Sequence, residues 1–384
     1  MASTLVTSNV SAHVREIWDL VVVGGGPAGL AVAIVAAEQG LSVLVLEQRN
    51  FPPDKACGEG LLPPGVRALE RLGVIPYLDL ARARPFVGIR FIQEDRSSVE
   101  VFLPDTGGLG IRRTVLVEAM TRRAEDLGAV VRHKCSAYDV ELKRNEAVVR
   151  TRTGKASARL LVAADGLHSA LRRAAGLETA RRGRRRFALR QHFKVRPWTD
   201  MVEAYVDRYG EAVVTPVSDD SVDINFVWEE GTIQRPTIAS LASRFPALQS
   251  WLGDAPAISS VKGAGPLARG ATRRTCDRMV LVGDAAGFLD SISGEGLSIA
   301  FNSALILGRH LPRILASGAT RRSMRTYERA ARRLFRSYSL VTTGLLWLAR
   351  HPRARVATIN YFARHPAICG AVTNRAMRLM ASPA

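Results

Sequence analysis

Lysine and cysteine are scarce in this chain of 384 residues, and long apolar runs are lacking. Cysteine occurs four times, at positions 57, 135, 276 and 369. No pair has the CxxC spacing, which argues against zinc knuckles and thioredoxin-like dithiols. The wide scatter favours reduced thiols over a disulfide scaffold. The first sixteen residues show no apolar signal core, and no later run reaches the roughly 18 residues of a membrane span. We therefore expect a soluble, cytoplasmic protein.

Basic residues exceed acidic ones by 19, and 48 of the 54 basic residues are arginine. This excess permits nucleic acid, anionic lipid or a phosphorylated ligand as a partner, but selects none of them. The densest basic run, 181–186, lacks interleaved aromatic residues, so base stacking is disfavoured and we expect a solvated linker. A nucleic-acid-binding role is a minor alternative that rests on net charge alone. Serine, histidine and aspartate show no spacing that would indicate hydrolysis.

The first chemistry-bearing segment is a glycine-rich turn. A β-branched run over 17–23 precedes the sequence GGGPAG at 24–29, a helical stretch over 30–39 and a buried strand over 41–46. This order is typical of a dinucleotide-binding βαβ unit. On these residues alone the ligand is FAD or NAD.

Each residue type in this unit has a mechanical role. Gly24 allows the tight turn, Gly26 the approach of a pyrophosphate, and Gly29 close packing of the helix on the sheet. Pro27 suits the first helical position. The carboxylate that follows the second strand can accept hydrogen bonds from ribose hydroxyls. The predicted contacts are Gly24, Gly26, Pro27, Ala28, Gly29, Glu47 and Gln48.

Two further motifs follow predicted strands. DGLHSALR at 165–172 follows a strand over 160–164, and GDAAG at 283–287 follows one over 279–282, with GEGL at 294–297 opening a helix. With these, residues 17–315 resemble the FAD-dependent oxidoreductases of the p-hydroxybenzoate hydroxylase and geranylgeranyl reductase superfamily. The resemblance implies tightly bound, non-covalent FAD, with NAD(P)H as a transient reductant.

The resemblance also implies roles for single residues. Asp284 would hold the ribityl and pyrophosphate region. The backbone at Gly294, Gly296 and Leu297 would face the pyrimidine edge of the flavin. Asp165 and Gly166 would lie near the cofactor, although Asp165 could also cap the helix ahead of Ser169.

Two more candidates come from shorter segments. Arg113, or its neighbour Arg112, resembles the arginine of the R-x-x-L motif that contacts FAD. Cys57, in KACGEG at 55–60, resembles the loop placed against the isoalloxazine, and a buried, inert thiol is the alternative. The halogenase signature WxWxIP is missing, which argues against halogenation.

The middle of the chain alternates apolar and polar residues. The pattern over 187–228, with 86–103, predicts antiparallel strands with one wet face and so a substrate domain. His192 is a weak acid/base candidate, but its place in the pattern favours a solvated or structural histidine. Beyond residue 321 the chain is helical, basic and apolar. That part could cap the cavity, form a dimer seam or rest on an anionic membrane.

We expect an α/β fold, α+β overall: a Rossmann-like FAD-binding domain with a parallel sheet, an antiparallel substrate domain and a helical C-terminal segment. The predicted boundaries are 1–80, 104–180 and 265–320 for the FAD-binding domain, 81–103 and 181–264 for the substrate domain, and 321–384 for the helices. We expect a monomer or homodimer, and no metal site.

The predicted activity is an NAD(P)H- and O2-dependent monooxygenation in secondary metabolism. It would hydroxylate or epoxidise a hydrophobic aromatic, quinone-like or prenylated molecule through a flavin C4a-hydroperoxide. Reduction of C=C bonds, as in geranylgeranyl reductases, is the alternative, because CGEG and the glycine after GDAA resemble that branch.

Overall fold

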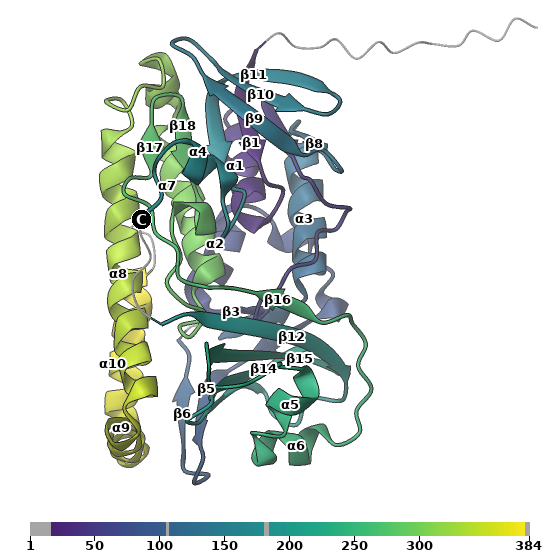
Figure 1. The fold of residues 1–384 in the computed structure, drawn as a ribbon, viewed down its shortest axis with the longest axis vertical. Helices are drawn as coiled ribbons and strands as arrows, with labels where there is room; N and C mark the ends of the chain where they lie inside the picture. The colour runs from purple at the N-terminus through teal and green to yellow at the C-terminus, as the bar shows by residue number, and fades with distance from the viewer. Residues whose placement is uncertain (1–16, 105–106, 180–183, 381–384) are drawn as a thin grey trace, which may run out of the picture.

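A computed structural model describes residues 17–104, 107–179 and 184–380. A parallel sheet with its helices forms one half of the molecule, a second large sheet forms the other, and three C-terminal helices run along one side of both (Figure 1). The predicted mixed α/β architecture is confirmed. The domain boundaries stay a prediction.

The first sheet has eight strands, and its main path follows the order β17-β18-β11-β1-β2-β8. The neighbours from β18 to β8 run parallel. Strands β9 and β10 extend it as an antiparallel hairpin. The bounds are β1 Trp18–Val23, β2 Val43–Leu46, β8 Val130–Arg132, β9 Ala137–Leu142, β10 Ala147–Thr151, β11 Gly154–Ala163, β17 Thr275–Cys276 and β18 Met279–Leu281.

The centre of this sheet is buried on both faces, because residues 20–23 of β1, 43–46 of β2 and 160–163 of β11 are all apolar. Leu20 and Val22 point into a core shared with the helices α1 (Pro27–Ala37), α3 (Arg113–Asp126) and α7 (Gly296–Ala316). Val21 and Val23 point to the other side, toward β10 and the short helix α4 (Ala170–Ala174). Helix α2 (Pro63–Arg71) packs on α7.

The second sheet has seven strands in the order β16-β12-β15-β14-β13-β5-β6, antiparallel except for the pair β13–β5. Helices α5 (Ile238–Ala242) and α6 (Pro246–Leu252) cover its apolar face. A small antiparallel sheet, β3-β7-β4, lies between the halves. The remaining bounds are β3 Gly60–Leu61, β4 Ala83–Phe86, β5 Gly88–Gln93, β6 Ser98–Phe102, β7 Gly108–Ile111, β12 Arg186–Lys194, β13 Met201–Val206, β14 Gly210–Ser218, β15 Ser221–Glu229, β16 Lys262–Ala264, and the 3-10 turns Ile75–Tyr77, Leu80–Arg82 and Gly283–Ala286.

The expectation of a wet face on this sheet is wrong. Arg190 and His192 alternate with the apolar residues of β12, yet both are fully buried. Their face is turned toward the first half of the molecule, where it meets other polar groups instead of water. The linker prediction for 181–186 is wrong at its end, because Arg186 begins β12 and is buried against Glu211 and Asp290. Residues 181–183 lie outside the described residues.

The C-terminal part is helical, as predicted, and forms α8 (Arg325–Arg350), α9 (Pro352–Arg364) and α10 (Pro366–Met380). Helix α8 packs on α7, α9 lies against β6, and α10 contacts both α8 and α2. In the part of the chain that the structure describes, every helix is too short or too polar to cross a bilayer.

Candidate functional site

The three glycine-bearing turns meet at one edge of the parallel sheet. Gly24 follows β1, Glu47 follows β2, Asp165 comes just after β11 and Gly283 just after β18. Because these strands are parallel neighbours, their carboxyl ends lie side by side, where doubly wound sheets bind ligands. A cavity of about 1290 Å³ opens there and extends between the two sheets to the C-terminal helices.

The first turn requires glycine at two positions. Gly24 has φ +111°, and a Cβ on it would lie 2.3 Å from the carbonyl oxygen of Ala164. A Cβ on Gly29 would lie 2.0 Å from the carbonyl oxygen of Gly24. No side chain caps the N-terminus of α1, where Gly26 is the N-cap and Pro27 follows. Free amides and the helix dipole are thus available to an anion such as a diphosphate.

Glu47 and Arg113 flank this turn. The amides of Gly25 and Arg49 each donate to one carboxylate oxygen of Glu47, at 2.8 Å. The Arg113 guanidinium lies 3.1 Å from where a Cβ of Gly26 would be. Arg113 lines the cavity, as do Ala28 and Gln48, whereas Arg112 does not. Of the two rival arginines, Arg113 is the one in position to contact a phosphate.

The second and third turns bring their predicted residues to the same cavity. Asp165 accepts hydrogen bonds from the Ser169 hydroxyl (2.5 Å) and the Leu171 amide (3.1 Å), so it does stabilise the start of α4. It lines the cavity as well, so its two predicted roles are compatible. The other predicted residues that line the cavity here are Gly166, Asp284, Gly294, Gly296 and Leu297.

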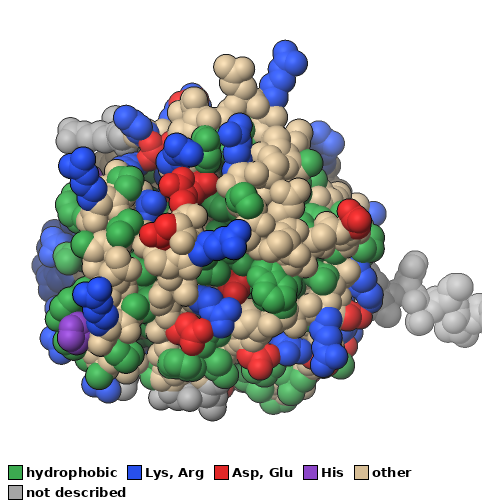
Figure 2. Space-filling model, turned by 90° about the horizontal axis from the view of Figure 1, so that it is seen from below, with side chains coloured by type: hydrophobic (Ala, Val, Ile, Leu, Met, Phe, Trp, Pro, Cys, Tyr) green, Lys and Arg blue, Asp and Glu red, His purple; other side chains and the backbone are tan. Residues whose placement is uncertain are grey.

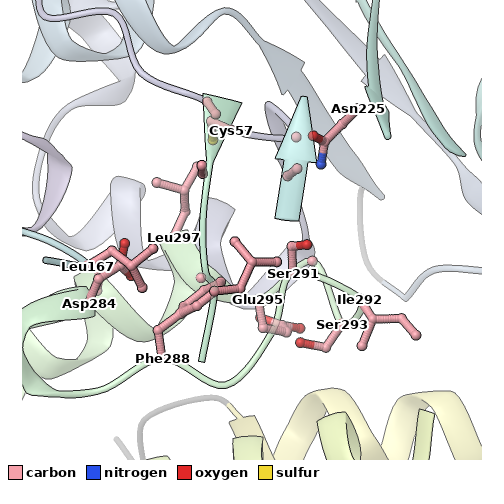
Figure 3. A pocket seen from close by; sticks show the side chains of 18 of the residues that line it. Cys57, Leu167, Asn225, Asp284, Phe288, Ser291, Ile292, Ser293, Glu295 and Leu297 are labelled. Carbon is pink, nitrogen blue, oxygen red and sulfur yellow. The ribbon is translucent and has the colours of Figure 1, made fainter. Parts of the chain in front are cut away.

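The loop from Lys55 to Gly60 forms another wall. Cys57 faces the cavity, across from Asp284 and Glu295 (Figure 3). Burial raises the pKa of the Cys57 thiol, so it is protonated at neutral pH and unsuited to act as a nucleophile. Burial, together with the charges of Arg113 and Arg49, lowers the pKa of Lys55 against the opposing effect of Asp284.

A buried polar network holds this loop from behind. His192 Nε2 lies 2.6 Å from Glu59 Oε2, and Nδ1 lies 3.0 Å from Arg190 Nη1. A guanidinium only donates, so Nδ1 accepts and Nε2 donates to Glu59. Glu59 in turn accepts from the Arg113 amide at 2.9 Å. His192 is therefore structural and buried rather than solvated, and it orients the loop that carries Cys57.

The carboxylate of Asp223 lies beside this network, 3.7 Å from Arg190 Nε and 3.6 Å from His192 Nε2, and forms no hydrogen bond to the described residues. Burial and the nearby Glu59 carboxylate raise its pKa well above the ordinary range. The ligand atoms of Glu59, His192 and Asp223 lie within 4.8 Å of one another, a separation that could suit a metal ion. The Nδ1 lone pair of His192 is already occupied, however, and the positive charge of Arg190 opposes a cation. We assign the group as a buried cluster of charges, in which Arg190 and the His192–Glu59 hydrogen bond compensate the carboxylates.

Several polar residues of the cavity escaped the sequence predictions, among them Glu295 and Asn225. Glu295, the N-cap of α7, is 1% exposed, and both its carboxylate oxygens lack a hydrogen-bond partner among the described residues. Burial raises its pKa to about 7. Asn225 on β15 is 6% exposed, and its side-chain oxygen is equally unpartnered. For Asn225 the available signal was a polar residue inside the largely apolar stretch 222–228, whereas the glycine- and serine-rich segment around Glu295 offered no such signal.

The donor set fits a flavin dinucleotide. A helix N-terminus and Arg113 can meet the phosphates, and Glu47 can meet a ribose. Farther along, Asn225, Ser291 and Glu295 offer buried side-chain atoms that have no partner among the described residues. Unsatisfied buried polar atoms are rare in native proteins, so a polar ligand is the natural partner for these.

Comparison with known proteins agrees with this geometry. A family profile described as "FAD binding domain" matches residues 18–339. A menaquinone reductase of Mycobacterium tuberculosis is 31% identical over 305 residues, 73% of this chain and 72% of its own. A digeranylgeranylglycerophospholipid reductase of Methanopyrus kandleri is 30% identical over 307 residues, 76% and 78% of the two chains. The structure of p-nitrophenol 4-monooxygenase from Pseudomonas putida has the same fold, with a TM-score of 0.81 at 20% identity over 96% and 99% of the chains.

Proposed function

The chain is an FAD-dependent oxidoreductase of the FAD binding domain family, and on that premise we propose that it reduces C=C bonds in a long apolar substrate of the isoprenoid type. The observation that carries this proposal is the length and lining of the cavity. Its volume of about 1290 Å³ exceeds the roughly 300–1,000 Å³ of an ordinary small-ligand site. The cavity can therefore hold a dinucleotide and an extended second molecule.

The cofactor end is polar and rigid. Gly24 and Gly26 shape the turn, where the diphosphate would lie; Arg113 and the start of α1 would supply positive charge to it, and Glu47 would accept from a ribose. Asp284 and the backbone of Gly294 to Leu297 would hold the flavin end. When bound there, FAD supplies two-electron redox chemistry.

The opposite end is apolar. Ile89 and Phe91 of β5 face it from the second sheet, and Leu345, Ile359 and Phe362 face it from α8 and α9. An aliphatic chain gains about 0.8 kcal/mol for each CH₂ group that leaves water for such surroundings. This lining favours a prenyl-like chain over a compact polar substrate, in keeping with the names of the two reductase relatives.

Saturation of a C=C bond adds a hydride to one carbon and a proton to the other, so the site must also hold a proton. The Glu295 carboxyl, with a pKa of about 7, retains one over much of the neutral range. It lies in the cavity across from Cys57 (Figure 3). We assign Glu295 as the proton donor and the protonated Cys57 thiol as a neighbour that keeps this region uncharged.

The proposed source of electrons is NAD(P)H. A second pocket of about 520 Å³ shares Lys55 and His168 with the main cavity. Arg49 and Lys262 add positive charge that suits the phosphates of a nicotinamide nucleotide.

Oxygenation is the second candidate. The fold that is shared over almost the whole length of p-nitrophenol 4-monooxygenase supports it, as does the apolar lining of the cavity. Under this alternative the same residues would bind FAD, and the substrate would be more compact.

The two candidates are separated by reducing the purified holoenzyme with NADPH or NADH under anaerobic conditions. A menaquinone is then added, and in a parallel series a geranylgeranylated glycerophospholipid. We expect reoxidation of the flavin without air and a product that gains two hydrogens per double bond, measured by absorbance and mass spectrometry. A product that contains oxygen and forms only after air is admitted would favour oxygenation. If neither lipid reoxidises the flavin anaerobically and neither yields a product after air is admitted, the isoprenoid proposal is wrong.

A further inference from the structure

Apart from Glu328 near the start of α8, all Asp, Glu, Lys and Arg positions of the C-terminal helices are arginine. From residue 329 onward the chain has ten arginines and no aspartate or glutamate. Arg332 pairs with Glu328, and Arg350 pairs with Glu229. Within the described residues, the other arginines of α8, α9 and α10 have no acidic partner. Viewed from the end where α9 lies, basic and hydrophobic side chains alternate along the left edge, the side of these helices (Figure 2).

The same helices expose large apolar side chains. Leu340 and Trp347 on α8 are 75% and 53% exposed, and Val372 on α10 is 52% exposed. Leu340 and Trp347 are seven residues apart, two helical turns, so they lie on one face. Arg336 precedes Leu340 by one turn, and Arg375 follows Val372 by one turn, so each helix presents arginine and apolar residues together. We call these five residues the C-terminal face.

Three members of the C-terminal face also line the cavity. Leu340, Trp347 and Val372 are exposed to solvent and yet belong to the cavity wall. The cavity therefore opens to the outside between α8 and α10. An aliphatic substrate that approached through water would meet these residues first.

We propose that the C-terminal face docks on an anionic lipid bilayer, so that the cavity opens toward the membrane. Apolar side chains beside unpaired arginines fit such a surface, and tryptophan favours the interface between water and lipid. A second copy of the chain fits less well, because symmetric pairing would bring arginines together without an acidic partner. The reason for docking rests on the proposed lipid substrate, but the binding itself does not.

The test is co-sedimentation of the holoenzyme with vesicles of phosphatidylcholine, with and without an equal part of phosphatidylglycerol. We expect binding to the anionic vesicles that weakens with salt, and little binding to the neutral ones. The pair Leu340→Glu and Trp347→Glu should reduce binding at least about tenfold, because two apolar contacts are lost. Leu142→Glu, an exposed leucine on β9 at the far end of the molecule, is the matched control and should bind as the wild type does.

Charge is tested separately. Arg336→Ala with Arg375→Ala should weaken binding by about fivefold per arginine, whereas Arg152→Ala in the β10–β11 turn should not. Flavin content and thermal unfolding verify that each variant is folded.

Equal binding to neutral and anionic vesicles, or none to either, would contradict the inference. So would a Leu340/Trp347 variant that keeps its vesicle binding but loses dimers in sedimentation velocity. Turnover of a short-chain, detergent-soluble substrate tests the proposed function separately. The arginine variant should retain that turnover, so loss of docking and loss of function can be distinguished.

Discussion

The two large sheets bury their faces by different means. The parallel sheet is apolar on both sides, and its contribution to the site comes from the backbone turns at its strand ends, such as those at Gly24 and Gly283. The second sheet is apolar toward α5 and α6, whereas its other face combines apolar residues such as Ile89 with buried charged groups such as Arg190. One sheet thus builds the site with backbone geometry, and the other builds it with compensated side-chain charges.

The largest expected effect comes from breaking the backbone turn. Gly24→Ala places a Cβ against the carbonyl of Ala164 at a φ of +111°, and should cost about 4 kcal/mol or more and abolish flavin binding. Gly40→Ala is the control, because Gly40 also has positive φ (+74°) but open space around it. It should cost about 1 to 2 kcal/mol and leave flavin binding intact. Flavin absorbance and thermal unfolding measure both. Equal losses in the two variants would show that the contact with Ala164 is unimportant.

The second largest effect should come from breaking the buried charge network around Arg190. Arg190→Met leaves Glu59 and Asp54 without their buried cation, and we expect a loss of about 3 to 5 kcal/mol in the free energy of unfolding. Lys194→Met, four residues on in the same strand, removes an exposed ion pair with Asp220 and should leave stability unchanged. Denaturant titration compares the two. A small effect at Arg190 would mean that the charges of this face reach water after all.

The third prediction concerns Glu295, a buried carboxyl group whose effect on stability should depend on pH. Its folded pKa of about 7 lies above the ordinary value of 4.5, so the folded state binds the proton more tightly than the unfolded state does. Its effect on stability is therefore neutral below about pH 4.5 and increasingly unfavourable as pH rises toward 7. In the apoprotein, the free energy of unfolding of Glu295→Gln should exceed that of the wild type by up to about 3 kcal/mol at pH 8. Near pH 4 the two values should be equal. Urea titrations across this range provide the test, and a difference that is constant with pH would contradict it.

The smallest expected effect concerns the two neighbouring arginines at the start of α3. Arg113→Met should weaken FAD binding by about 10- to 100-fold, since one charge-assisted contact is lost. Arg112→Met should change it much less, because that side chain does not line the cavity. Fluorescence titration of the apoprotein with FAD distinguishes them, and the reverse order would restore Arg112 as the contact.

Much of the fold and of the cofactor end could be predicted because the signals are local. Strand, glycine turn and helix follow one another within about thirty residues, and the three turns could be recognised from their order in the chain. The charges of β12 and β15 could not be assigned in this way. The alternation of Arg190 and His192 with apolar residues shows only that they share a face, and it does not show what covers that face.

The features that could be predicted from the sequence depend on interactions within short segments. One such feature is the tight turn that needs positive φ at Gly24, and another is an apolar strand that must be buried on both sides. The residues of a short segment are enough to predict each of them. Glu59, His192 and Asp223 come from distant parts of the chain, and so do Leu340 and Val372 at the cavity mouth. Their roles arise from long-range packing, because the tertiary structure determines which charged groups become buried and which apolar side chains stay exposed to solvent.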